Sequence, residues 1–417
     1  MSRILFVTSR LPWPTDSGRK VSLWHYCRGL AARGHSVSLF VFPEWDQPRS
    51  AADKPDFIER VYFSEKIRKG EKLKNLLCRA AVGKARWPLQ CALYYSKANA
   101  RAIARAAEEI GADTVLFDMI RTAPYMNAPF TAPVRKILDL DDLLSRRYER
   151  QLAGDAGSNG VAGRYGGGMA PAAERLLCRG RIGRMVLKAE QKRLKKAEIA
   201  FSEASDGVIL VSAEETAYLN TLLKSKEAFA VPMGVDVDAF TAADGVAKES
   251  ALIGFVGNMH VAANADSLAY IADEVLPLMP PCTLEVVGTY PEEIAKRYEN
   301  SPNVVLRGRV EAIPPVAGRW QLMLSPITFG SGIKTKILEA MAMALPVVTN
   351  AVGAESIDDG EGTCLLQAET AEELAAAATR VLHDPAYGAA LGHAARDYVK
   401  AHFSWEQIFE EFAHLGL

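Results

Sequence analysis

The chain has 417 residues, of which 49% are hydrophobic and 24% are charged, and its formal net charge is −1. This composition is typical of a globular protein of two or three domains, and it excludes a disordered or fibrous chain. No apolar run approaches the roughly 20 residues needed to cross a bilayer. The N-terminus does not resemble a signal peptide. We therefore expect a cytoplasmic protein.

The two halves of the chain differ in charge. Residues 1–230 contain 38 Lys and Arg against 25 Asp and Glu, whereas the remaining residues contain 11 against 25. Opposite signs in the two halves indicate two domains with different partners. A basic half favours an anionic membrane surface, nucleic acid or a phosphorylated substrate. Because no nucleic-acid recognition motif accompanies the charge, we expect no nucleic-acid partner.

The six cysteines show no CxxC pair and no other metal-binding spacing. They are typical of reduced, mostly buried residues in a cytosolic protein. We expect no metal ligands in this chain and no cofactor requirement.

The chain opens with a strand, a glycine-containing loop, a helix and a second strand, with the strands at residues 3–8 and 36–42. This βαβ unit predicts a parallel sheet. In the loop, Gly18 can bring the backbone close to a phosphate or a sugar, and Arg19 lies beside it. The full GxGxxG pattern is missing, which disfavours an NAD site. A stiff surface loop without a ligand is the alternative.

Two segments of the first half are basic and amphipathic. Residues 66–101 interleave Lys and Arg with Leu, Val, Trp and Tyr, and residues 175–196 repeat the pattern. Such helices can lie in a lipid interface, where each Lys or Arg contributes on the order of 1 kcal/mol. Two such segments favour peripheral contact with the inner face of the cytoplasmic membrane. The alternative is a pair of solvated helix faces that cover core stripes.

Charged residues follow two further predicted strands, at residues 114–118 and 135–140. Side chains at the carboxyl ends of strands in an open α/β sheet point into the ligand crevice. We therefore place Asp118 and Arg121 with Arg19 in an acceptor site, and expect Asp139 or Asp141 to act as a catalytic group there. Helix capping is the alternative role for such aspartates.

A second set of alternating strands and helices follows residue 240, where the charge changes sign, so we place a domain boundary near 235–250. Residues 154–168 are rich in glycine and predict a flexible insertion. In the second half we predict strands at residues 252–256, 284–287, 304–306, 322–324, 347–349 and 364–366. Polar residues that follow these strands and could contact a ligand are Gly257, Asn258, His260 and Arg309.

Residues 325–348 contain the most specific pattern, a strand end, a glycine loop, a helix and another strand. Gly330 and Gly332 flank Ser331 and let a ligand approach the backbone. The helix begins near residue 333, so its free N–H groups point into the loop and attract anions. Lys334 and Lys336 add positive charge there, and Glu339 lies where a carboxylate can accept bonds from sugar hydroxyls. The combination suits a ligand that is part diphosphate and part polyol.

Several segments, taken in order, resemble glycosyltransferases of the GT-B type. They are PWPTDSGRKVSLWHYCRGLAARGHSVSLF at residue 12, VPMGVDVDAF at 231, IGFVGNM at 253, LRGRV at 306 and SPITFGSGIKTKILEAMAMALPVVTNAVG at 325. Together they span nearly the whole chain. The resemblance is to family 4, the retaining enzymes of bacterial polysaccharide assembly.

The resemblance implies an α/β fold of two Rossmann-like domains that face each other across a cleft. We accordingly expect an acceptor-binding domain at residues 1–235, a donor-binding domain at 236–400, and a helix at 401–417 that packs back on the first domain. Of the family's two glutamates, Glu339 matches the one that binds the donor ribose, but Ser331 stands where the other belongs. The family's Arg/Lys pair after the first strand of the donor domain is also replaced, and we expect Lys334 to supply that charge.

The implied reaction moves a sugar from a UDP- or GDP-sugar to a saccharide acceptor, with Lys334 and the helix start stabilising the leaving phosphate. No cofactor or metal is required. The basic first half favours an acceptor linked to polyprenyl diphosphate at an anionic membrane surface. Two alternatives are a sugar-nucleotide epimerase of the same fold and a non-catalytic binding partner in a polysaccharide complex.

Overall fold

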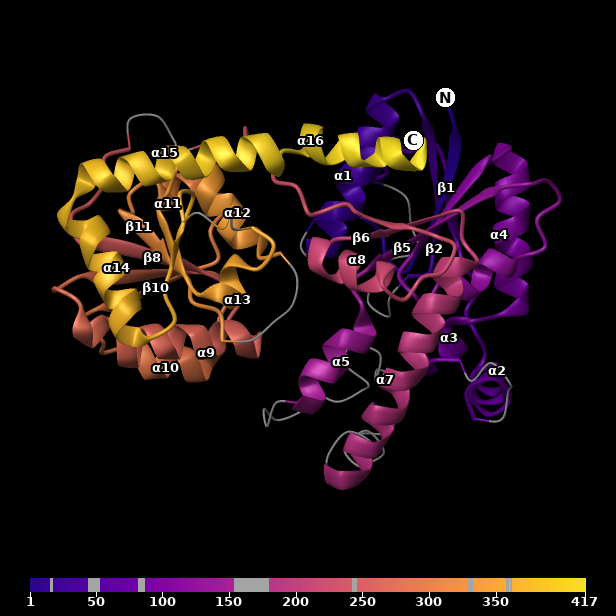
Figure 1. The fold of residues 1–417 in the computed structure, drawn as a ribbon, viewed down its shortest axis with the longest axis horizontal. Coiled ribbons are helices and arrows are strands. Elements are labelled where there is room, and N and C mark those ends of the chain that lie inside the picture. The colour runs from indigo at the N-terminus through magenta and orange to yellow at the C-terminus, as the bar shows by residue number, and fades with distance from the viewer. Residues whose placement is uncertain are drawn as a thin grey trace. The chain divides into compact units, whose positions relative to one another are not determined.

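The computed structural model describes residues 1–15, 18–43, 53–81, 87–153, 180–241, 246–328, 333–357, 360 and 362–417. The chain forms two compact units (Figure 1). Unit 1 contains Met1–Val231 and Glu411–Leu417, and unit 2 contains Pro232–Glu410. The observed division therefore falls after Val231 and again after Glu410, whereas the sequence suggested residues 235 and 400.

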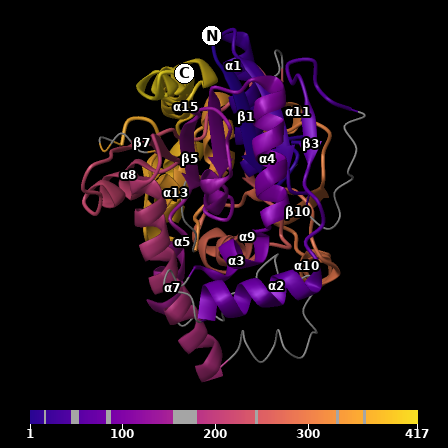
Figure 2. The ribbon, with the colours of Figure 1, turned by 90° about the vertical axis from the view of Figure 1, so that its right-hand side faces the viewer.

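In the described residues of unit 1, seven parallel strands form a sheet in the order β3-β2-β1-β4-β5-β6-β7. Its central strands are buried along nearly their whole length, as expected when helices cover both faces of a parallel sheet. In Figure 2, α4 crosses in front of the sheet. The strands are β1 (Arg3–Thr8), β2 (Ser36–Val41), β3 (Val61–Phe63), β4 (Thr114–Asp118), β5 (Arg135–Asp141), β6 (Gly207–Leu210) and β7 (Ala228–Ala230).

Local sequence signals set where helices of unit 1 begin and end, as in α4. Helix α4 begins at an N-cap, Ser96, whose side chain accepts from the Ala98 N–H, and ends at Gly111 in a left-handed conformation. The helices are α1 (Gly18–Ala32), α2 (Lys69–Asn75), the π-helical turn η1 (Leu76–Ala81), α3 (Leu89–Tyr94), α4 (Lys97–Ile110), η2 (Ala123–Asn127), α5 (Leu144–Ala153), α7 (Gly180–Glu203) and α8 (Ala213–Asn220).

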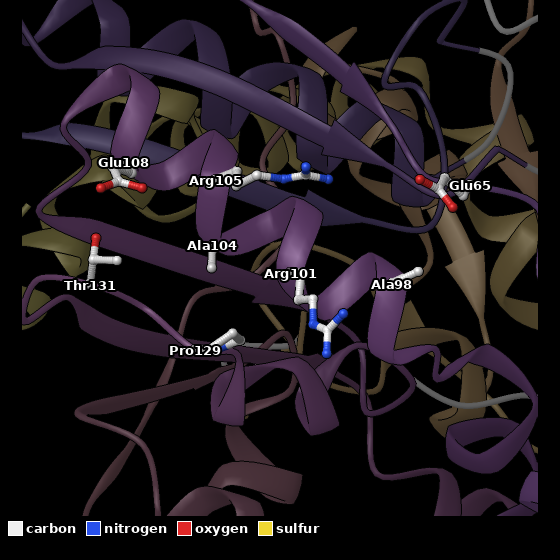
Figure 3. A pocket seen from close by; sticks show the side chains of 8 residues that line it. All are labelled: Glu65, Ala98, Arg101, Ala104, Arg105, Glu108, Pro129 and Thr131. Atoms are coloured by element: carbon white, nitrogen blue, oxygen red, sulfur yellow. The ribbon is translucent and has the colours of Figure 1, made fainter.

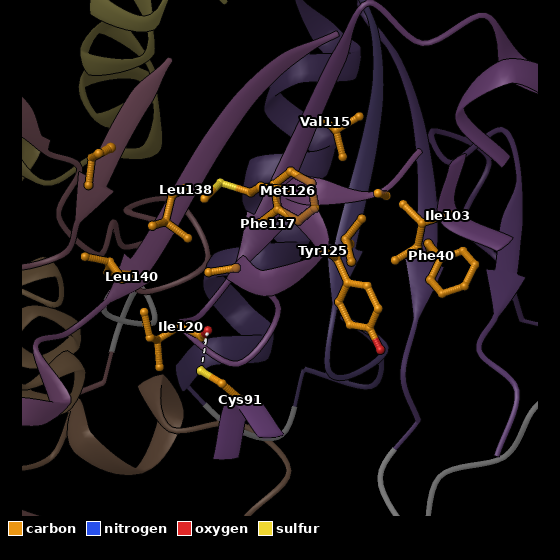
Figure 4. Packing of buried hydrophobic residues seen from close by; sticks show 14 of the residues in the cluster. Phe40, Cys91, Ile103, Val115, Phe117, Ile120, Tyr125, Met126, Leu138 and Leu140 are labelled. Carbon is orange, nitrogen blue, oxygen red and sulfur yellow. Dashed lines mark hydrogen bonds between the residues drawn. The ribbon is translucent and has the colours of Figure 1, made fainter. Parts of the chain in front are cut away.

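The core of unit 1 lies between the sheet and the helices that pack on it (Figure 4). Phe117 on β4 and Leu138 on β5 are fully buried, and Tyr125 of η2 packs beside them. The Cys91 thiol on α3 donates to the backbone oxygen of Ile120 at 3.2 Å. Strand β3 was not predicted, since three residues are too few to show a period of two.

Unit 2 repeats the arrangement, and the part of it that the structure describes has six parallel strands in the order β10-β9-β8-β11-β12-β13. The predicted α/β class with two Rossmann-like domains is therefore confirmed. The last strand lies at Leu366–Gln367 rather than at residues 364–366. The strands are β8 (Leu252–Val256), β9 (Thr283–Val287), β10 (Val304–Gly308), β11 (Leu322–Leu324), β12 (Val347–Thr349) and β13 (Leu366–Gln367).

The helices of unit 2 include α14, which opens with a complete capping box of Thr370 and Glu373. The helices are α9 (Ala262–Tyr270), η4 (Ile271–Val275), η5 (Leu276–Leu278), α10 (Glu292–Tyr298), α11 (Pro314–Ala317), α12 (Thr335–Ala342), α13 (Ala351–Ala354), α14 (Ala371–His383), α15 (Pro385–His402) and α16 (Trp405–Glu411).

The chain returns to unit 1 with its last residues, which form the turn η6 (Phe412–Leu415). Phe412 is fully buried and packs edge-on against Tyr26, with 5.0 Å between the ring centres. Leu415 is also buried, next to Gly207 at the start of β6. Residues 411–417 are thus an integral part of the unit 1 core.

Among the residues that the structure describes, no helix is both long enough and apolar enough to cross a membrane.

Gly254 in β8 offers a direct test of this packing, because a Cβ there would lie 1.9 Å from Cε3 of the buried Trp320. We expect Gly254→Ala to destabilise unit 2 by about 3 kcal/mol, through overpacking against a rigid ring. Gly70→Ala is the control, because a Cβ in that helical position meets no atom within 4 Å. It should stabilise α2 by about 0.5–1 kcal/mol. Calorimetric melting measures both, and an unchanged melting temperature for Gly254→Ala would contradict the packing.

Candidate functional site

Polar residues gather at the carboxyl edge of each sheet, where parallel strands all end on the same side. In unit 1 the strands β1, β4 and β5 end at Thr8, Asp118 and Asp141. This is the edge at which open α/β sheets bind their ligands.

The unit 1 edge holds an arginine–aspartate cluster, formed by Arg19, Asp118, Asp139 and Asp141. Arg19, near the start of α1, donates from Nε to Asp118 Oδ1 at 2.9 Å. Its terminal nitrogens reach Asp139 Oδ2 at 2.5 Å and Asp141 Oδ1 at 3.2 Å. One guanidinium therefore joins carboxylates from two neighbouring strands, and the structure brings together four of the predicted site residues.

Exposure separates the three carboxylates. The side chains of Asp118 and Asp139 are 0% and 1% exposed, whereas that of Asp141 is 22% exposed. Asp141 also adopts a left-handed backbone conformation, with φ of 65°, and its N–H donates to Asp139 Oδ1 at 2.9 Å. Such a conformation is costly for a residue other than glycine and recurs at functional sites. Asp141 is thus the member of the cluster that a ligand can reach.

The pKa values of the two buried carboxylates shift in opposite directions. Burial alone would raise the pKa of Asp118, but Arg19, Arg10 and the Thr8 hydroxyl together hold that pKa below its usual value. Burial raises the pKa of Asp139 to about 6, because Arg19 offsets it only in part and the neighbouring aspartates oppose ionisation. Of the two buried carboxylates, Asp139 therefore gains a proton before Asp118 as the pH falls.

Arg121, the remaining predicted acceptor residue, is also buried near this edge. Its guanidinium carbon lies 5.4 Å from the ring centre of Tyr94, and one terminal nitrogen lies 3.0 Å from Met119 Sδ. Met119 directly follows β4 and, like Asp141, has a positive φ, 66°. The ends of both β4 and β5 are therefore backbone outliers next to charged groups.

In unit 2, the loop after β8 carries the predicted ligand residues Gly257, Asn258 and His260. Asn258 Oδ1 accepts from the His260 N–H at 3.0 Å and from the Thr289 hydroxyl, after β9, at 2.9 Å. A Cβ on Gly257 would lie 2.9 Å from Cγ of Asn264 on α9, so only glycine fits without a shift. His260 itself is exposed.

The two lysines at the start of α12 have different surroundings. Lys334 Nζ lies 3.3 Å from Glu355 Oε2, just after α13, and both side chains are largely buried. Lys336 Nζ donates to Asn264 Oδ1 at 3.0 Å and lies 4.5 Å from the ring centre of Phe255. Burial, and then the charge of Lys334, lower the pKa of Lys336 to about 7. Lys334 is thus charge-compensated within the protein, whereas Lys336 is held by a neutral amide.

Glu339, one turn further along α12, is half-buried. Within the described ranges, its carboxylate makes no hydrogen bond. Burial raises the pKa of Glu339 to about 7. A desolvated carboxylate that accepts no hydrogen bond from the described residues is suited to accept bonds from the hydroxyls of a ligand.

The remaining predicted donor residues are less informative. Arg309 follows β10 and is exposed. Gly18 is the first residue of α1, in unit 1 rather than unit 2. Gly330, Ser331 and Gly332 lie outside the described residues, as does the glycine-rich segment 154–168.

Two surface hollows, both lined by described residues, lie away from the predicted site residues. One of about 410 Å³ runs along α4 and is lined by Arg101, Arg105, Glu65 and Glu108 among others (Figure 3). A second, of about 240 Å³, lies at the amino ends of β8 and β9, beside Glu285. Neither contains a predicted site residue. In the described parts of the chain, no His, Cys, Asp and Glu side chains are grouped to hold a metal ion.

Three residues of the unit 2 edge escaped the sequence analysis: Asn264, Thr289 and Glu355. Each contacts a residue that was predicted: Asn264 binds Lys336, Thr289 binds Asn258, and Glu355 binds Lys334. No spacing in the sequence links these pairs, because the partners lie between 21 and 72 residues apart. Only the strand order of the sheet makes them neighbours.

Parts of this sequence are similar to known proteins. Residues 250–384 match the family described as Glycosyl transferases group 1. A GDP-mannose-dependent monoacylated alpha-(1-6)-phosphatidylinositol monomannoside mannosyltransferase of Corynebacterium glutamicum is 28% identical over 226 residues. That match covers 47% of this chain and 59% of the relative, so it spans about three fifths of the relative's length.

Solved structures resemble the whole fold. The sucrose-phosphate synthase of Thermosynechococcus elongatus has a TM-score of 0.70 at 16% identity, covering 99% of this chain and 98% of its own. HepE of Anabaena in complex with UDP and glucose has a TM-score of 0.64 at 15% identity, covering 100% and 99%. These likenesses confirm the GT-B fold that the sequence predicted.

The contacts of the arginine–aspartate cluster predict how two substitutions change the stability of unit 1. Arg19→Met would remove the guanidinium that two buried carboxylates share, and we expect it to destabilise unit 1 by about 3–5 kcal/mol. Asp139→Asn is the matched control, because Arg19 keeps two charged partners and the buried net charge becomes less negative. It should cost far less. Thermal and denaturant unfolding of the two variants measure the difference, and equal losses would contradict the role given to Arg19.

Proposed function

We propose that this protein is a retaining glycosyltransferase of family 4, which moves a sugar from a UDP- or GDP-sugar to a saccharide acceptor. The observation that carries the proposal is the start of α12, where two lysines share the carboxyl edge of unit 2 with a carboxylate that accepts no hydrogen bond from the described residues. The segment lies within the residues that match group 1 glycosyl transferases. The name of the mannosyltransferase relative specifies GDP-mannose, and HepE was solved with UDP, which supports a nucleotide-sugar donor here.

The donor would lie against the unit 2 edge. In this proposal, Lys334, Lys336 and the first N–H groups of α12 bind the diphosphate, and Glu339 accepts bonds from the ribose hydroxyls. Gly257, Gly330 and Gly332 would let the donor approach the backbone closely. The base or the transferred sugar would be contacted by Asn258, His260, Arg309 and Ser331. The acceptor would bind at the unit 1 edge through Arg19, Asp118 and Arg121.

The chemistry follows from charge. The bond between the anomeric carbon and the phosphate oxygen breaks ahead of attack, so positive charge develops on the sugar and negative charge on the phosphate. Lys334, Lys336 and the helix start stabilise that phosphate without a metal ion. The acceptor hydroxyl attacks from the same face and its proton passes to the leaving phosphate. Asp141, with Asp139 behind it, orients the acceptor hydroxyl.

Glu339 provides the test of this function. The purified chain should release UDP or GDP from a sugar nucleotide when a saccharide acceptor is present. Glu339→Gln should lower kcat/KM for the donor about 10- to 100-fold, because a charged acceptor of ribose hydrogen bonds is lost. Glu372→Gln, an exposed glutamate of α14, is the control and should have no effect. Isomerised sugar nucleotide without release would instead indicate an epimerase, and no binding of sugar nucleotides would indicate a non-catalytic partner.

We further propose that the acceptor is lipid-linked, for instance through polyprenyl diphosphate, and that unit 1 contacts an anionic membrane. The protein would then serve bacterial surface or exopolysaccharide assembly from the cytoplasmic side. The name of the mannosyltransferase relative describes a phosphatidylinositol-based substrate, which supports a lipid acceptor.

A basic apolar face on unit 1 supports the membrane contact. Leu73 in α2 and Leu77 in η1, one turn apart, are 59% and 54% exposed. Met185 near the start of α7 is 72% exposed, and in Figures 1 and 2 α2 and the first half of α7 lie below the sheet of unit 1. The basic residues around the leucines are Lys66, Arg68, Lys69, Lys72, Lys74 and Arg79. Exposed leucines within a basic helix suit an anionic lipid interface.

Vesicle binding tests this face. Wild-type protein should sediment with vesicles of phosphatidylcholine and phosphatidylglycerol. Leu73→Ser with Leu77→Ser should weaken that binding about 10- to 100-fold, because two leucine side chains no longer leave water. Leu278→Ser is the control, since Leu278 in unit 2 is 52% exposed but lies outside the basic face. Equal binding by the double variant, or no binding by wild type, would contradict the membrane contact.

A further inference from the structure

The side chain of Lys336 is held in an unusual way for a buried cation. Its ammonium donates to the Asn264 amide oxygen at 3.0 Å and sits 4.5 Å from the centre of the Phe255 ring. No ion pair joins it to a carboxylate in the part of the chain that the structure describes, although Glu339 is only three residues away. None of the described carboxylates therefore compensates its positive charge.

Asn264 is itself fixed by the neighbouring loop. Its amide nitrogen donates to the backbone oxygen of Asn258 at 3.0 Å, so its oxygen must face Lys336. Asn258 is in turn bound to Thr289, after β9, through its side-chain oxygen. A chain of hydrogen bonds thus runs from the loops after β8 and β9, through α9, to the first turn of α12.

Lys334 provides the contrast within the same turn. Its ammonium lies 3.3 Å from Glu355, so its charge is already met by a carboxylate. An anion that binds at the start of α12 gains more from Lys336, whose present partners are an amide and a ring. A buried cation without a counter-ion is costly, and an incoming diphosphate would relieve that cost.

We infer that Asn264 is a positioning residue that holds the Lys336 ammonium, still uncompensated, at the subsite for the donor diphosphate. This inference rests on the proposed function. An amide at position 264 is suited to the task because it accepts one hydrogen bond and leaves the positive charge in place. A carboxylate there would neutralise Lys336, and a methyl group would release it.

The pKa of Lys336 depends on the charged groups around it. Lys334 lies on its own segment and lowers the pKa of Lys336 after burial does, to about 7. Glu355, from the segment after α13, is engaged with Lys334. Asp266 on α9 and His260 in the preceding loop are exposed, and Glu339 follows on α12. Because the anion binds the protonated lysine, affinity for the donor should fall as the pH rises above about 7.

The test measures binding of UDP-glucose, GDP-mannose and inorganic pyrophosphate by calorimetry between pH 6 and pH 9. Neither sugar nucleotide titrates on its diphosphate in this range. Asn264→Asp should weaken donor binding about tenfold at pH 7 and move the loss of affinity to higher pH, because the new carboxylate raises the pKa of Lys336 by at least about one unit. Asn264→Ala should weaken binding by about the same factor and move that loss to lower pH.

A merely structural role for Asn264 would not produce these shifts in opposite directions. In a Lys336→Gln background, Asn264→Ala should have no further effect on donor affinity, because both changes remove the same interaction. Asn300→Asp, at an exposed position before β10, is the matched control for added charge and should leave affinity and pH profile unchanged. Melting temperatures confirm that each variant is folded.

The outcomes separate the two proposals. If wild-type protein binds a sugar nucleotide and both Asn264 variants keep its affinity and pH profile, this inference is overturned and the proposed function stands. If wild type binds neither sugar nucleotide and no pyrophosphate, both are overturned. Opposite pH shifts in the two variants, with no added loss in the Lys336→Gln background, support the inference.

Discussion

Compensation of buried charge governs both candidate edges of this protein. A charged side chain removed from water must find a counter-charge, or its charged form becomes unfavourable. At the unit 1 edge, one guanidinium meets three carboxylates, so the cation is more than compensated and negative charge remains. At the unit 2 edge, an ammonium meets an amide and a carboxylate meets no protein donor in the described ranges. The first edge thus pairs its cation and keeps surplus negative charge, whereas the described residues of the second edge leave one cation and one carboxylate without a counter-charge.

The two edges also differ in how they are built. The arginine–aspartate cluster is held by side chains that come directly from strand ends and from the first turn of α1, so its geometry depends on the register of β4 and β5. The unit 2 edge depends on loops that are tied to one another, with Asn258 joined to Thr289 and Asn264. Rigid strands position one set of groups, and a hydrogen-bonded network positions the other. The division suits a surface that presents one substrate and a surface that receives another.

Much of the fold could be predicted, because buried parallel strands leave continuous apolar runs in the sequence and the helices between them carry caps, as at Thr370. Strand β3 and the position of β13 could not, since two or three residues show no period. At the sites, residue types at strand ends identified Asp118, Asp139 and Asp141 as candidates. The sequence did not show that Arg19 pairs with all three of them. It also did not show that Lys334 pairs with a carboxylate while Lys336 pairs with an amide, because partners such as Glu355 lie far away in the sequence. Single-sequence patterns contain no information on such pairs.

The last seven residues belong to unit 1, and this has a consequence for how the chain acquires its structure during synthesis. All of unit 2 is translated before Phe412 and Leu415 emerge from the ribosome, and both side chains are buried in unit 1. Until then, Tyr26 lacks its aromatic neighbour and the start of β6 lacks its cover. The first-made unit is therefore the last to be completed, and it waits with an open apolar surface while the second unit folds.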